Sequence, residues 1–275
     1  MRADPTTTDR AVHEDLGLRV ETSAKSWFSL LGELEIRKDG IDHAPTAPKL
    51  LQIMALLILQ AGKTVHTDSI IWELWSESPP RSVRTAIQTY VYQLRRSIEE
   101  NGLATNGECV LETKTPGYRL CVSPEQIDVF LFQRLCSQGR EEFEAGLFDQ
   151  AAASLRAALS LCSGNPMANV RCGPVLLSHA VALGEQRRNA LHLRIQAEIE
   201  LGEHRDLVAE LRSLAADSLD ETVHMQLMQA LSRSGRRPEA LGIYRDLRTR
   251  LVEELGLEPS GELQRLHRDL LSHDR

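Results

Sequence analysis

Apolar residues recur at helical spacing between residues 81 and 100, and this is the clearest pattern in the chain. One face of the expected helix carries Val83, Ile87, Val91, Leu94 and Ile98. At about 100° per residue, the opposite face carries polar side chains, a tyrosine and arginines: Arg81, Thr85, Gln88, Thr89, Tyr92, Gln93 and Arg96. The pattern predicts an amphipathic helix from Arg81 to Glu100, ended by Asn101 and Gly102.

The polar face of this expected helix is basic. Four arginines and no acidic residue lie between Arg81 and Arg96. Donors, acceptors and a cation on one helix face suit the base edges and phosphates of a DNA major groove. We therefore expect a DNA-recognition helix. An ordinary amphipathic helix with a solvated polar face explains this stretch alone about equally well, because basic helices are common.

The stretch before this helix predicts a small sheet followed by two helices. We expect strands at Trp27–Leu31 and Glu33–Arg37, a turn at Lys38–Gly40, and helices at Thr46–Ala61 and Asp68–Trp75. Gly62 follows the first helix as a stop signal, and Thr67 is placed to cap the second. Pro79 and Pro80 then require an extended loop before the basic helix.

A β-hairpin signal follows the basic helix. Cys109–Thr113 and Tyr118–Cys121 flank a turn at Lys114–Gly117, where glycine supplies a positive φ. A sheet, a helix-turn-helix and a hairpin in this order are typical of a winged helix. The residues of this wing that are placed to reach phosphates beside the groove are Thr113, Lys114, Thr115 and Arg119.

Helical periods replace strand signals from about residue 124 onward. They run through Asp128–Ala145, Phe148–Leu161, Pro174–Leu201, Arg205–Asp217, Glu221–Ser234, Pro238–Leu255 and Ser260–Leu271. The sequence looks alike around Gly146, Gly202 and Gly235, and the last two are 33 residues apart, close to the ~34-residue period of tetratricopeptide repeats. Small residues suited to close helix packing are Ala145, Ala151, Ala158 and Ala240. Residues 163–173 (SGNPMANVRCG) are expected to form a loop over the helical stack.

The predicted fold class is therefore mixed. An N-terminal α+β winged helix-turn-helix precedes an all-α, tetratricopeptide-like helical repeat domain. At 275 residues the chain exceeds what one core usually serves. We expect a flexible extension at 1–25, a winged-helix DNA-binding domain at 26–122 and the helical domain at 123–275.

Composition narrows the functional class. The hydrophobic content of 42% and the charged content of 26% are those of a soluble globular protein. No apolar run is long enough for a membrane span and the N-terminus has no apolar signal core, so we expect a cytoplasmic, nucleoid-associated protein. The net charge of −7 argues mildly against nucleic-acid binding, and residues 26–122 hold ten Lys or Arg against eleven Asp or Glu. The local field of the basic helix matters more than this total.

The sequence carries no motif for catalysis, nucleotide binding or metal binding. GxxxxGK[ST] and HExxH are both missing, so we expect no enzyme activity, no cofactor and no metal. The five cysteines show no CxxC spacing, which argues against a zinc site and a disulfide framework: Cys109, Cys121, Cys136, Cys162 and Cys172. A redox switch between Cys162 and Cys172 is a minor alternative.

Taken together, these elements resemble the Streptomyces antibiotic regulatory protein family. Its members are transcriptional activators with an OmpR-type winged helix joined to a bacterial transcriptional activation domain of tetratricopeptide-like helices. The resemblance covers about Phe28 to Leu271 and rests on LLGELEIRKDG, PKLLQIMALLILQAGKTV, IIWELWSESPPRSVRTAIQTYVYQLRRSIEENG, LETKTPGYRL and RRPEALGIYRDLRTRLVEELGLEPSGELQRL. The chain departs from the family at Cys162, where other members often have tryptophan.

The resemblance implies an activator that binds short direct repeats near a promoter −35 element, as two protomers side by side on double-stranded DNA. It implies recruitment of the RNA polymerase holoenzyme through σ region 4 and the α subunit, at an antibiotic or secondary-metabolite gene cluster. The residues expected to contact polymerase are Trp75, Ser76, Glu77, Ser78, Pro79 and Pro80. The residues expected to bind DNA are Arg81, Arg84, Thr85, Gln88, Thr89, Tyr92, Gln93, Arg95, Arg96, Lys114, Thr115 and Arg119.

Two classes of function stay open on this evidence. In the first, phosphates are contacted by Arg84, Arg95, Lys114 and Arg119. Bases are discriminated by Gln88, Tyr92, Gln93, Arg96 and the threonines of the basic helix. In the second, the winged helix docks on another protein and the repeat groove binds a peptide or a small effector. The nearly neutral charge of residues 26–122 favours the second class, and a gel shift with promoter DNA distinguishes the two.

Overall fold

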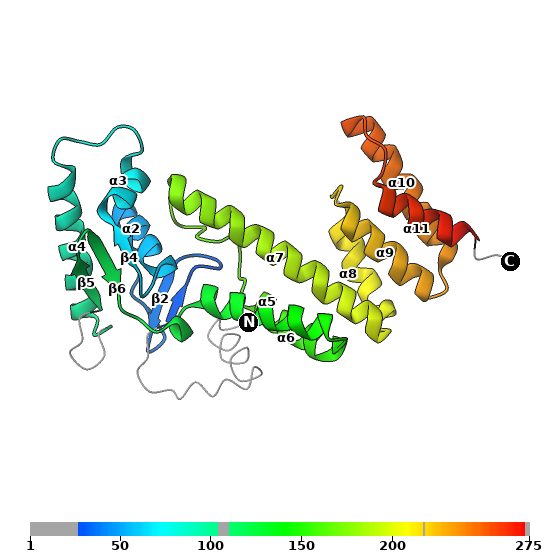
Figure 1. Cartoon of the computed structure of the whole chain (residues 1–275), viewed down its shortest axis with the longest axis horizontal. Coiled ribbons are helices and arrows are strands. Elements are labelled where there is room, and N and C mark those ends of the chain that lie inside the picture. Colours follow the sequence, from blue (N-terminus) through cyan, green and yellow to red (C-terminus); the bar gives the residue numbers. More distant parts are fainter. Residues whose placement is uncertain (1–26, 104–109, 217, 273–275) are drawn as a thin grey trace, which may run out of the picture. The chain divides into compact units, whose positions relative to one another are not determined.

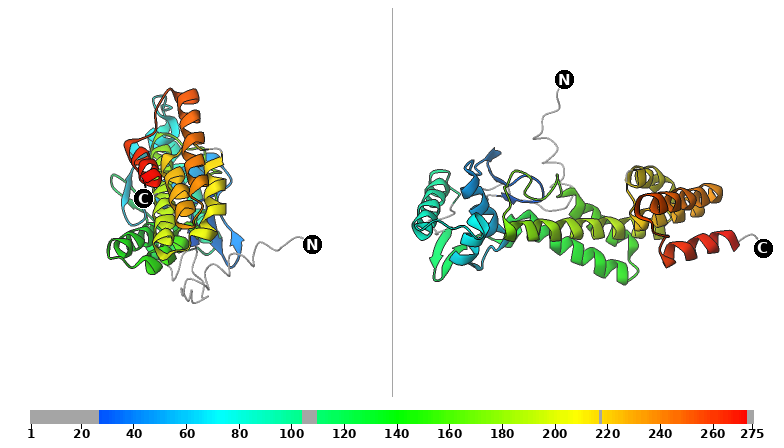
Figure 2. Two further views of the ribbon diagram at one scale, coloured as in Figure 1. Left: turned by 90° about the vertical axis from the view of Figure 1, so that its right-hand side faces the viewer. Right: turned by 90° about the horizontal axis from the view of Figure 1, so that it is seen from above.

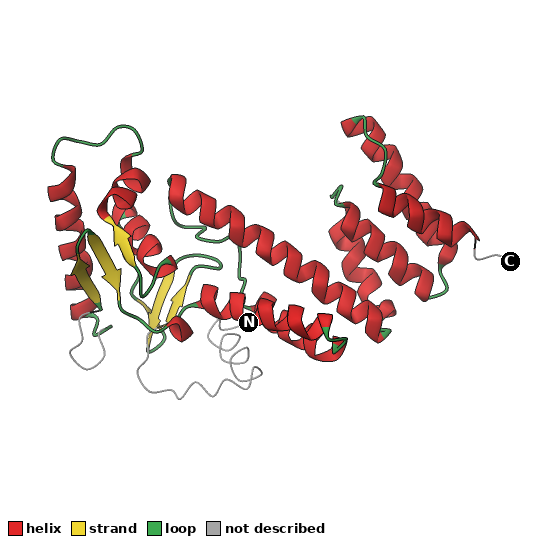
Figure 3. Ribbon diagram, in the orientation of Figure 1, coloured by secondary structure: helices red, strands yellow, loops and turns green. Residues whose placement is uncertain are grey.

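The computed structural model describes residues 27–103, 110–216 and 218–272 (Figure 1). The predicted extension at 1–25 lies outside them. The chain divides into two compact units: unit 1 contains Met1–Leu135 and Ala157–Arg188, and unit 2 contains Cys136–Arg156 and Asn189–Arg275. Within the described ranges, strands occur in unit 1 and unit 2 is helical (Figure 3). The mixed fold class is confirmed, whereas the boundary at residue 122 stays a prediction.

Three short antiparallel strands begin unit 1, in the order β1-β2-β3. They are β1 Trp27–Ser29, β2 Glu35–Lys38 and β3 Ile41–Asp42. The turn between β2 and β3 places Gly40 at a φ of 80°, which a residue without Cβ adopts at little cost. Phe28 and Ile36 pair across β1 and β2 and are both buried. The first two strands and the turn were predicted, and they are confirmed.

Three helices pack together in unit 1: α2 Pro48–Leu59, α3 Thr67–Trp75 and α4 Val83–Glu100. Helix α2 buries an unbroken run from Leu51 to Ile58, so it forms the centre of this unit. Pro48 stands in its first turn, where a missing N–H costs no hydrogen bond, and Gly62 has a φ of 77° beyond its end. Helices α3 and α4 contact α2 and each other, as in a helix-turn-helix.

A second sheet contains the wing, which is the hairpin of β5 Leu111–Lys114 and β6 Gly117–Leu120. Its strand order is β4-β6-β5, and β4 (Thr64–His66) was not predicted. Three residues with one buried side chain give too short a pattern to detect. Gly117 is required here, because a Cβ on it would lie 1.9 Å from the carbonyl oxygen of Val65.

The predicted capping role of Thr67 is wrong. Helix α3 begins at Thr67 itself, and His66 occupies the N-cap without a side-chain hydrogen bond. The Thr67 hydroxyl instead donates to the carbonyl oxygen of Pro116 at 3.0 Å, and its backbone N–H donates to the same oxygen at 3.1 Å. Pairing of β4 with the wing therefore places Thr67 beside the hairpin turn, where the carbonyl of Pro116 accepts both of its hydrogen bonds.

Residues 163–173 form a loop, as predicted, but its expected place over the helical stack is wrong. The segment packs on unit 1, where Ser163 and Met167 donate backbone hydrogen bonds to the carbonyls of Leu31 and Leu30. The side chain of Asn169 accepts from the N–H of Leu34 at 2.7 Å and donates to its carbonyl at 3.1 Å. The segment thus satisfies the backbone of the turn between β1 and β2.

Helices make up the rest of the described chain after a 3-10 turn at Pro124–Gln126. They are α5 Asp128–Glu144, α6 Phe148–Ser160, α7 Pro174–Leu201, α8 His204–Ala216, α9 Glu221–Arg233, α10 Arg237–Leu255 and α11 Gly261–Ser272. In unit 2, α9 lies side by side with α8 and α10 (Figures 1 and 2). Within the described ranges, none of these helices has the length and apolar character needed to cross a membrane.

The three similar glycines terminate helices in the same way. Gly146, Gly202 and Gly235 have φ values of 76°, 89° and 77°. In each turn, the residue after the glycine donates to the carbonyl five residues before it, as in the bond from Leu147 to Glu142. Gly102 ends α4 with the same bond, from Leu103 to Ile98, so the turn by itself does not identify a repeat. Ala151, Ala158 and Ala240 are buried as expected, but Ala145 is exposed at a helix end.

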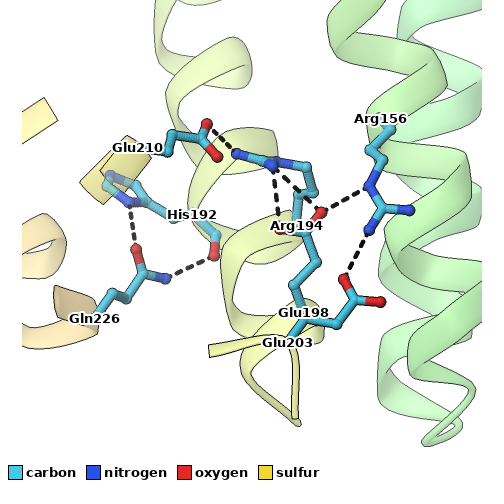
Figure 4. Close-up of polar contacts among 7 residues, drawn as sticks. All are labelled: Arg156, His192, Arg194, Glu198, Glu203, Glu210 and Gln226. Carbon is cyan, nitrogen blue, oxygen red and sulfur yellow. Dashed lines mark hydrogen bonds and ion pairs between the residues drawn. The ribbon is translucent and has the colours of Figure 1, made fainter. Parts of the chain in front are cut away.

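A buried carboxylate organises part of unit 2. Glu198 of α7 is 3% exposed and accepts from Arg156 Nε at 2.8 Å and from Arg194 Nη1 at 3.1 Å (Figure 4). Arg156 also pairs with Glu203, and Arg194 also pairs with Glu210 of α8. A buried charge is tolerated when it is paired and hydrogen-bonded, so this cluster joins α6, α7 and α8 as a structural feature.

Candidate nucleic-acid interface

Helix α4 separates its two faces as its periodicity predicted. Of the predicted apolar face, Ile87, Val91, Leu94 and Ile98 are buried in the core of unit 1, whereas Val83 is half-buried. All seven residues of the predicted polar face are exposed: Arg81, Thr85, Gln88, Thr89, Tyr92, Gln93 and Arg96. Tyr92 is 65% exposed, although a tyrosine ring is large and partly apolar. The surface that we name the α4 face, made of these seven residues, is open to a ligand.

The N-terminal end of α4 differs from the prediction. The helix begins at Val83, so Arg81 lies in the preceding turn and is not part of the helix. Thr89 donates its hydroxyl hydrogen to the carbonyl oxygen of Thr85 at 3.0 Å. This internal bond uses the donor of Thr89 but leaves the lone pairs of its oxygen available as acceptors.

Two arginines on the exposed side of α4 have weak protein partners. Arg96 Nε lies 2.7 Å from Glu100 Oε1, with the side chains 66% and 58% exposed. The hydrogen bond to Glu100 raises the pKa of Arg96 above its ordinary value. Arg84 lies 3.8 Å from Asp68, and both side chains are largely exposed. Such surface pairs are worth little in water, so a phosphate or a base edge can replace either carboxylate.

The other two predicted cations of this region are held more firmly. Arg95 is half-buried and donates to the carbonyl of Leu111 at 2.8 Å and to the hydroxyl of Thr113 at 2.9 Å. Arg119 pairs with Glu112 at 2.6 Å directly across the wing. The hydrogen bond from the guanidinium holds the pKa of the Glu112 carboxyl below its usual range.

The wing tip presents Lys114 and Thr115 to solvent. The Lys114 side chain forms no hydrogen bond or ion pair with the described residues, and Lys114 lies on the hairpin that Arg95 joins to α4. The tip therefore presents an exposed cation on a hairpin bonded to α4, which suits contact with a phosphate oxygen.

The loop between α3 and α4 contains the residues expected to contact polymerase. Ser76, Glu77, Ser78, Pro79 and Pro80 are exposed, whereas Trp75 is half-buried. The Trp75 ring stacks on Tyr90 of α4 at a centroid distance of 6.5 Å, and Lys49 Nζ lies 4.6 Å from the Trp75 ring centroid. The loop therefore begins at a packed aromatic residue and then extends into solvent.

Sequence reasoning missed the acidic and aromatic neighbours of this surface. A cross-strand spacing in the predicted hairpin was the available signal for Glu112 and Arg119. Tyr90 and Lys49 carried no comparable signal, because their contacts with Trp75 join separate helices. In the described part of the chain, no group of three or more His, Cys, Asp or Glu is arranged to hold a metal ion.

The two cysteines beside the 163–173 segment have unreactive environments. Burial raises the pKa of Cys162 to about 11 and raises the pKa of Cys172 as well. The thiolate is the reactive form, so both groups are protonated and slow to react near neutral pH. This weakens the redox-switch alternative.

Comparison with known proteins identifies both regions. Residues 43–120 match the family "Transcriptional regulatory protein, C terminal", and residues 127–271 match "Bacterial transcriptional activator domain". Regulatory protein DnrI of Streptomyces peucetius is 39% identical over 90% of this chain and 92% of its own length. Regulatory protein AfsR of Streptomyces coelicolor is 34% identical, and this chain spans 25% of it.

A solved structure shares this fold. It is Mycobacterium tuberculosis EmbR in complex with a low affinity phosphopeptide, which is 31% identical with a TM-score of 0.84 over 92% of this chain. This chain spans 66% of the EmbR chain in that structure. The exposed α4 face beside a wing, the two family matches and the identity with DnrI together show that this chain belongs to the Streptomyces antibiotic regulatory protein family of DNA-binding transcriptional activators.

Proposed function

We propose that the α4 face enters the major groove of promoter DNA while the wing tip contacts phosphates beside it. The exposure of all seven residues of the α4 face carries this proposal. Glutamine amides, threonine hydroxyls and a guanidinium offer the donors and acceptors that base edges require. Lys114 and Arg84 supply the charge that displaces counterions from the phosphates. The roles of Arg95 and Arg119 differ, because Nε and Nη2 of Arg95 donate to β5 and Nη2 of Arg119 donates to Glu112.

The finer parts of the proposal concern promoter architecture and polymerase. Two protomers bind side by side on direct repeats near the −35 element, in the cytoplasm and on the nucleoid. The exposed loop after Trp75 contacts the RNA polymerase holoenzyme at σ region 4 or the α subunit. Membership of the family supports an antibiotic or secondary-metabolite gene cluster as the target.

A gel shift with the full chain tests the DNA-binding part. The probes are promoter duplexes from the gene cluster that surrounds its gene, followed by footprinting of any shifted duplex. We expect two protected tracts one or more helical turns apart, consistent with direct repeats. Absence of a shift on every promoter at low salt would support the scaffold alternative, in which the winged helix docks on protein.

Footprinting with polymerase tests the recruitment part. We expect protection to extend over the −35 element when the holoenzyme is added, and the extension to weaken when Glu77 and Ser78 are both replaced by alanine. The same double variant is expected to bind DNA alone like the natural protein, because neither residue lies on the α4 face. Unchanged polymerase recruitment by this variant would remove the loop from the contact.

A further inference from the structure

Arg95 differs from the other arginines of α4 in the direction of its guanidinium. The side chains of Arg84 and Arg96 are 75% and 66% exposed. Arg95 is half-buried and reaches β5, the edge strand of the sheet β4-β6-β5. An arginine in a basic helix is ordinarily expected to meet a phosphate, but the donors of this one point at the protein.

Both acceptors of Arg95 lie on the same strand. Nε donates to the carbonyl oxygen of Leu111 at 2.8 Å, and Nη2 donates to the hydroxyl oxygen of Thr113 at 2.9 Å. A guanidinium presents its N–H groups in one plane at fixed separation, whereas a lysine ammonium is a single point charge. Two bonds to residues two positions apart therefore fix the direction of β5 as well as its distance from α4.

The wing is supported at other points that do not involve α4. Antiparallel pairing holds β6 against β4, with Gly117 opposite His66. The ion pair between Arg119 and Glu112 joins the two strands of the hairpin. These contacts make the hairpin a rigid piece, and Arg95 links that piece directly to the helix that carries the base-reading side chains.

We propose that Arg95 is a positioning residue, which sets the distance between the α4 face and the wing tip at Lys114 and Thr115. The inference rests on the proposed DNA-binding function and replaces a phosphate contact as the role of Arg95. In the proposed complex, α4 lies in the major groove of the DNA while the wing tip contacts the neighbouring phosphates, so both must fit the duplex at the same time. Loss of the two hydrogen bonds lets the tip move away while the contacts of α4 itself persist.

Binding to DNA by four full-length variants tests this role. They are Arg95→Ala, Arg95→Lys, Thr113→Val and the matched control Arg84→Ala, which removes an exposed cation from the same helix. The probe is the duplex that the natural protein selects from a randomised pool, and affinity is measured by fluorescence anisotropy over a range of salt concentrations. Two double variants complete the cycles: Arg95→Ala with Thr113→Val, and Arg84→Ala with Thr113→Val.

We expect Arg95→Lys to weaken specific binding about tenfold, although it keeps the charge, since lysine cannot make both bonds. Thr113→Val should add little to Arg95→Ala, because both remove the same bond. Arg84→Ala should lower the slope of log affinity against log salt by about 0.9. Its effect on the binding free energy should add fully to that of Thr113→Val. Natural affinity in Arg95→Lys, with additive effects of Arg95→Ala and Thr113→Val, would show a phosphate contact and overturn the proposal.

Amide hydrogen exchange of the free protein examines the same contact without DNA. We expect Arg95→Ala to speed exchange in residues 111–114 by about tenfold or more while α2 keeps its protection. Unchanged exchange in residues 111–114 would reject the proposal whatever the DNA results. If the natural protein selects no duplex, the proposed function fails, and the exchange rates still decide whether Arg95 fixes the wing.

Discussion

Glu73 of α3 and Gly173, the residue before α7, are joined by a hydrogen bond of 2.5 Å from the N–H of Gly173 to Oε1 of Glu73. The other carboxylate oxygen accepts from the N–H groups of Val175 and Leu176 at 2.9 and 3.0 Å. These amides belong to the first turn of α7 and have no partner within the helix. A helix-turn-helix residue therefore caps a helix that lies one hundred positions later in the chain.

Substitution of Glu73 by glutamine is expected to lower the free energy of unfolding by about 2–4 kcal/mol. Glu73 is 2% exposed, and an amide NH2 would face backbone N–H groups that now meet a carboxylate oxygen. Urea denaturation of the full chain measures the change. The control is Glu33→Gln at an exposed site, expected within about 0.5 kcal/mol of the natural protein. Equal losses in both variants would contradict a capping role.

Replacement of Gly173 by alanine is expected to destabilise the protein by about 2–3 kcal/mol. A Cβ there would lie 2.1 Å from the carbonyl oxygen of Glu73, which is backbone and cannot move aside easily. Gly184→Ala within α7 is the control, since no atom lies within 4 Å of its Cβ position. That change is expected to raise stability by about 0.5–1 kcal/mol, because alanine favours helix. Thermal unfolding that ranks the two variants alike would refute the steric argument.

Local sequence patterns predicted most helices and strands of this fold, but they did not predict which distant segments contact each other. Periodicity located the α4 face because the buried positions of a helix recur every three to four residues, and the apolar residues of the sequence show that spacing. The partner of residues 163–173 had no such signal, since the bonds to Leu30, Leu31 and Leu34 are mostly made by backbone groups. Backbone hydrogen bonds do not depend on side-chain identity, so sequence hardly encodes their partners.

The candidate site shows the same division. The sequence places four arginines between Arg81 and Arg96, but the role of each depends on what its guanidinium meets in three dimensions. Arg84 and Arg95 are both arginines of α4, yet one is exposed and the other donates to β5. What distinguishes the two arginines is the position of the wing, because β5 lies within reach of Arg95. An arginine that is expected to contact DNA and an arginine that positions the wing therefore look alike in the sequence.

The carboxyl group of Asp128 predicts a pH dependence of stability. Its Oδ2 accepts from the backbone N–H groups of Leu30 and Leu31 at 2.7 and 2.8 Å, and burial raises its pKa to about 6. Because the folded state binds this proton more tightly than the unfolded chain, the stabilisation is complete below pH 4 and is lost as pH rises to about 6. The expected loss is about 2–3 kcal/mol over that interval.

The Asp128→Asn variant isolates this contribution, because an amide oxygen accepts from the same N–H groups and does not titrate. We expect urea denaturation to show the natural protein losing stability relative to the variant between pH 4 and pH 6, and no further relative change above pH 7. Parallel curves for the two proteins across this interval would mean that Asp128 keeps an ordinary pKa when folded.

Arg96 and Lys114 are expected to affect DNA binding in different ways. Arg96→Ala should weaken binding to the selected duplex about tenfold or more and binding to random duplex much less, because its guanidinium reaches base edges once it leaves Glu100. Lys114→Ala should weaken both by similar factors and reduce the slope of log affinity against log salt by about 0.9, as the loss of one phosphate contact does. Anisotropy titrations at several salt concentrations measure both quantities. Identical specificity ratios in the two variants would mean that Arg96 contacts only the DNA backbone, which would leave Gln88, Tyr92 and Gln93 as the side chains that discriminate bases.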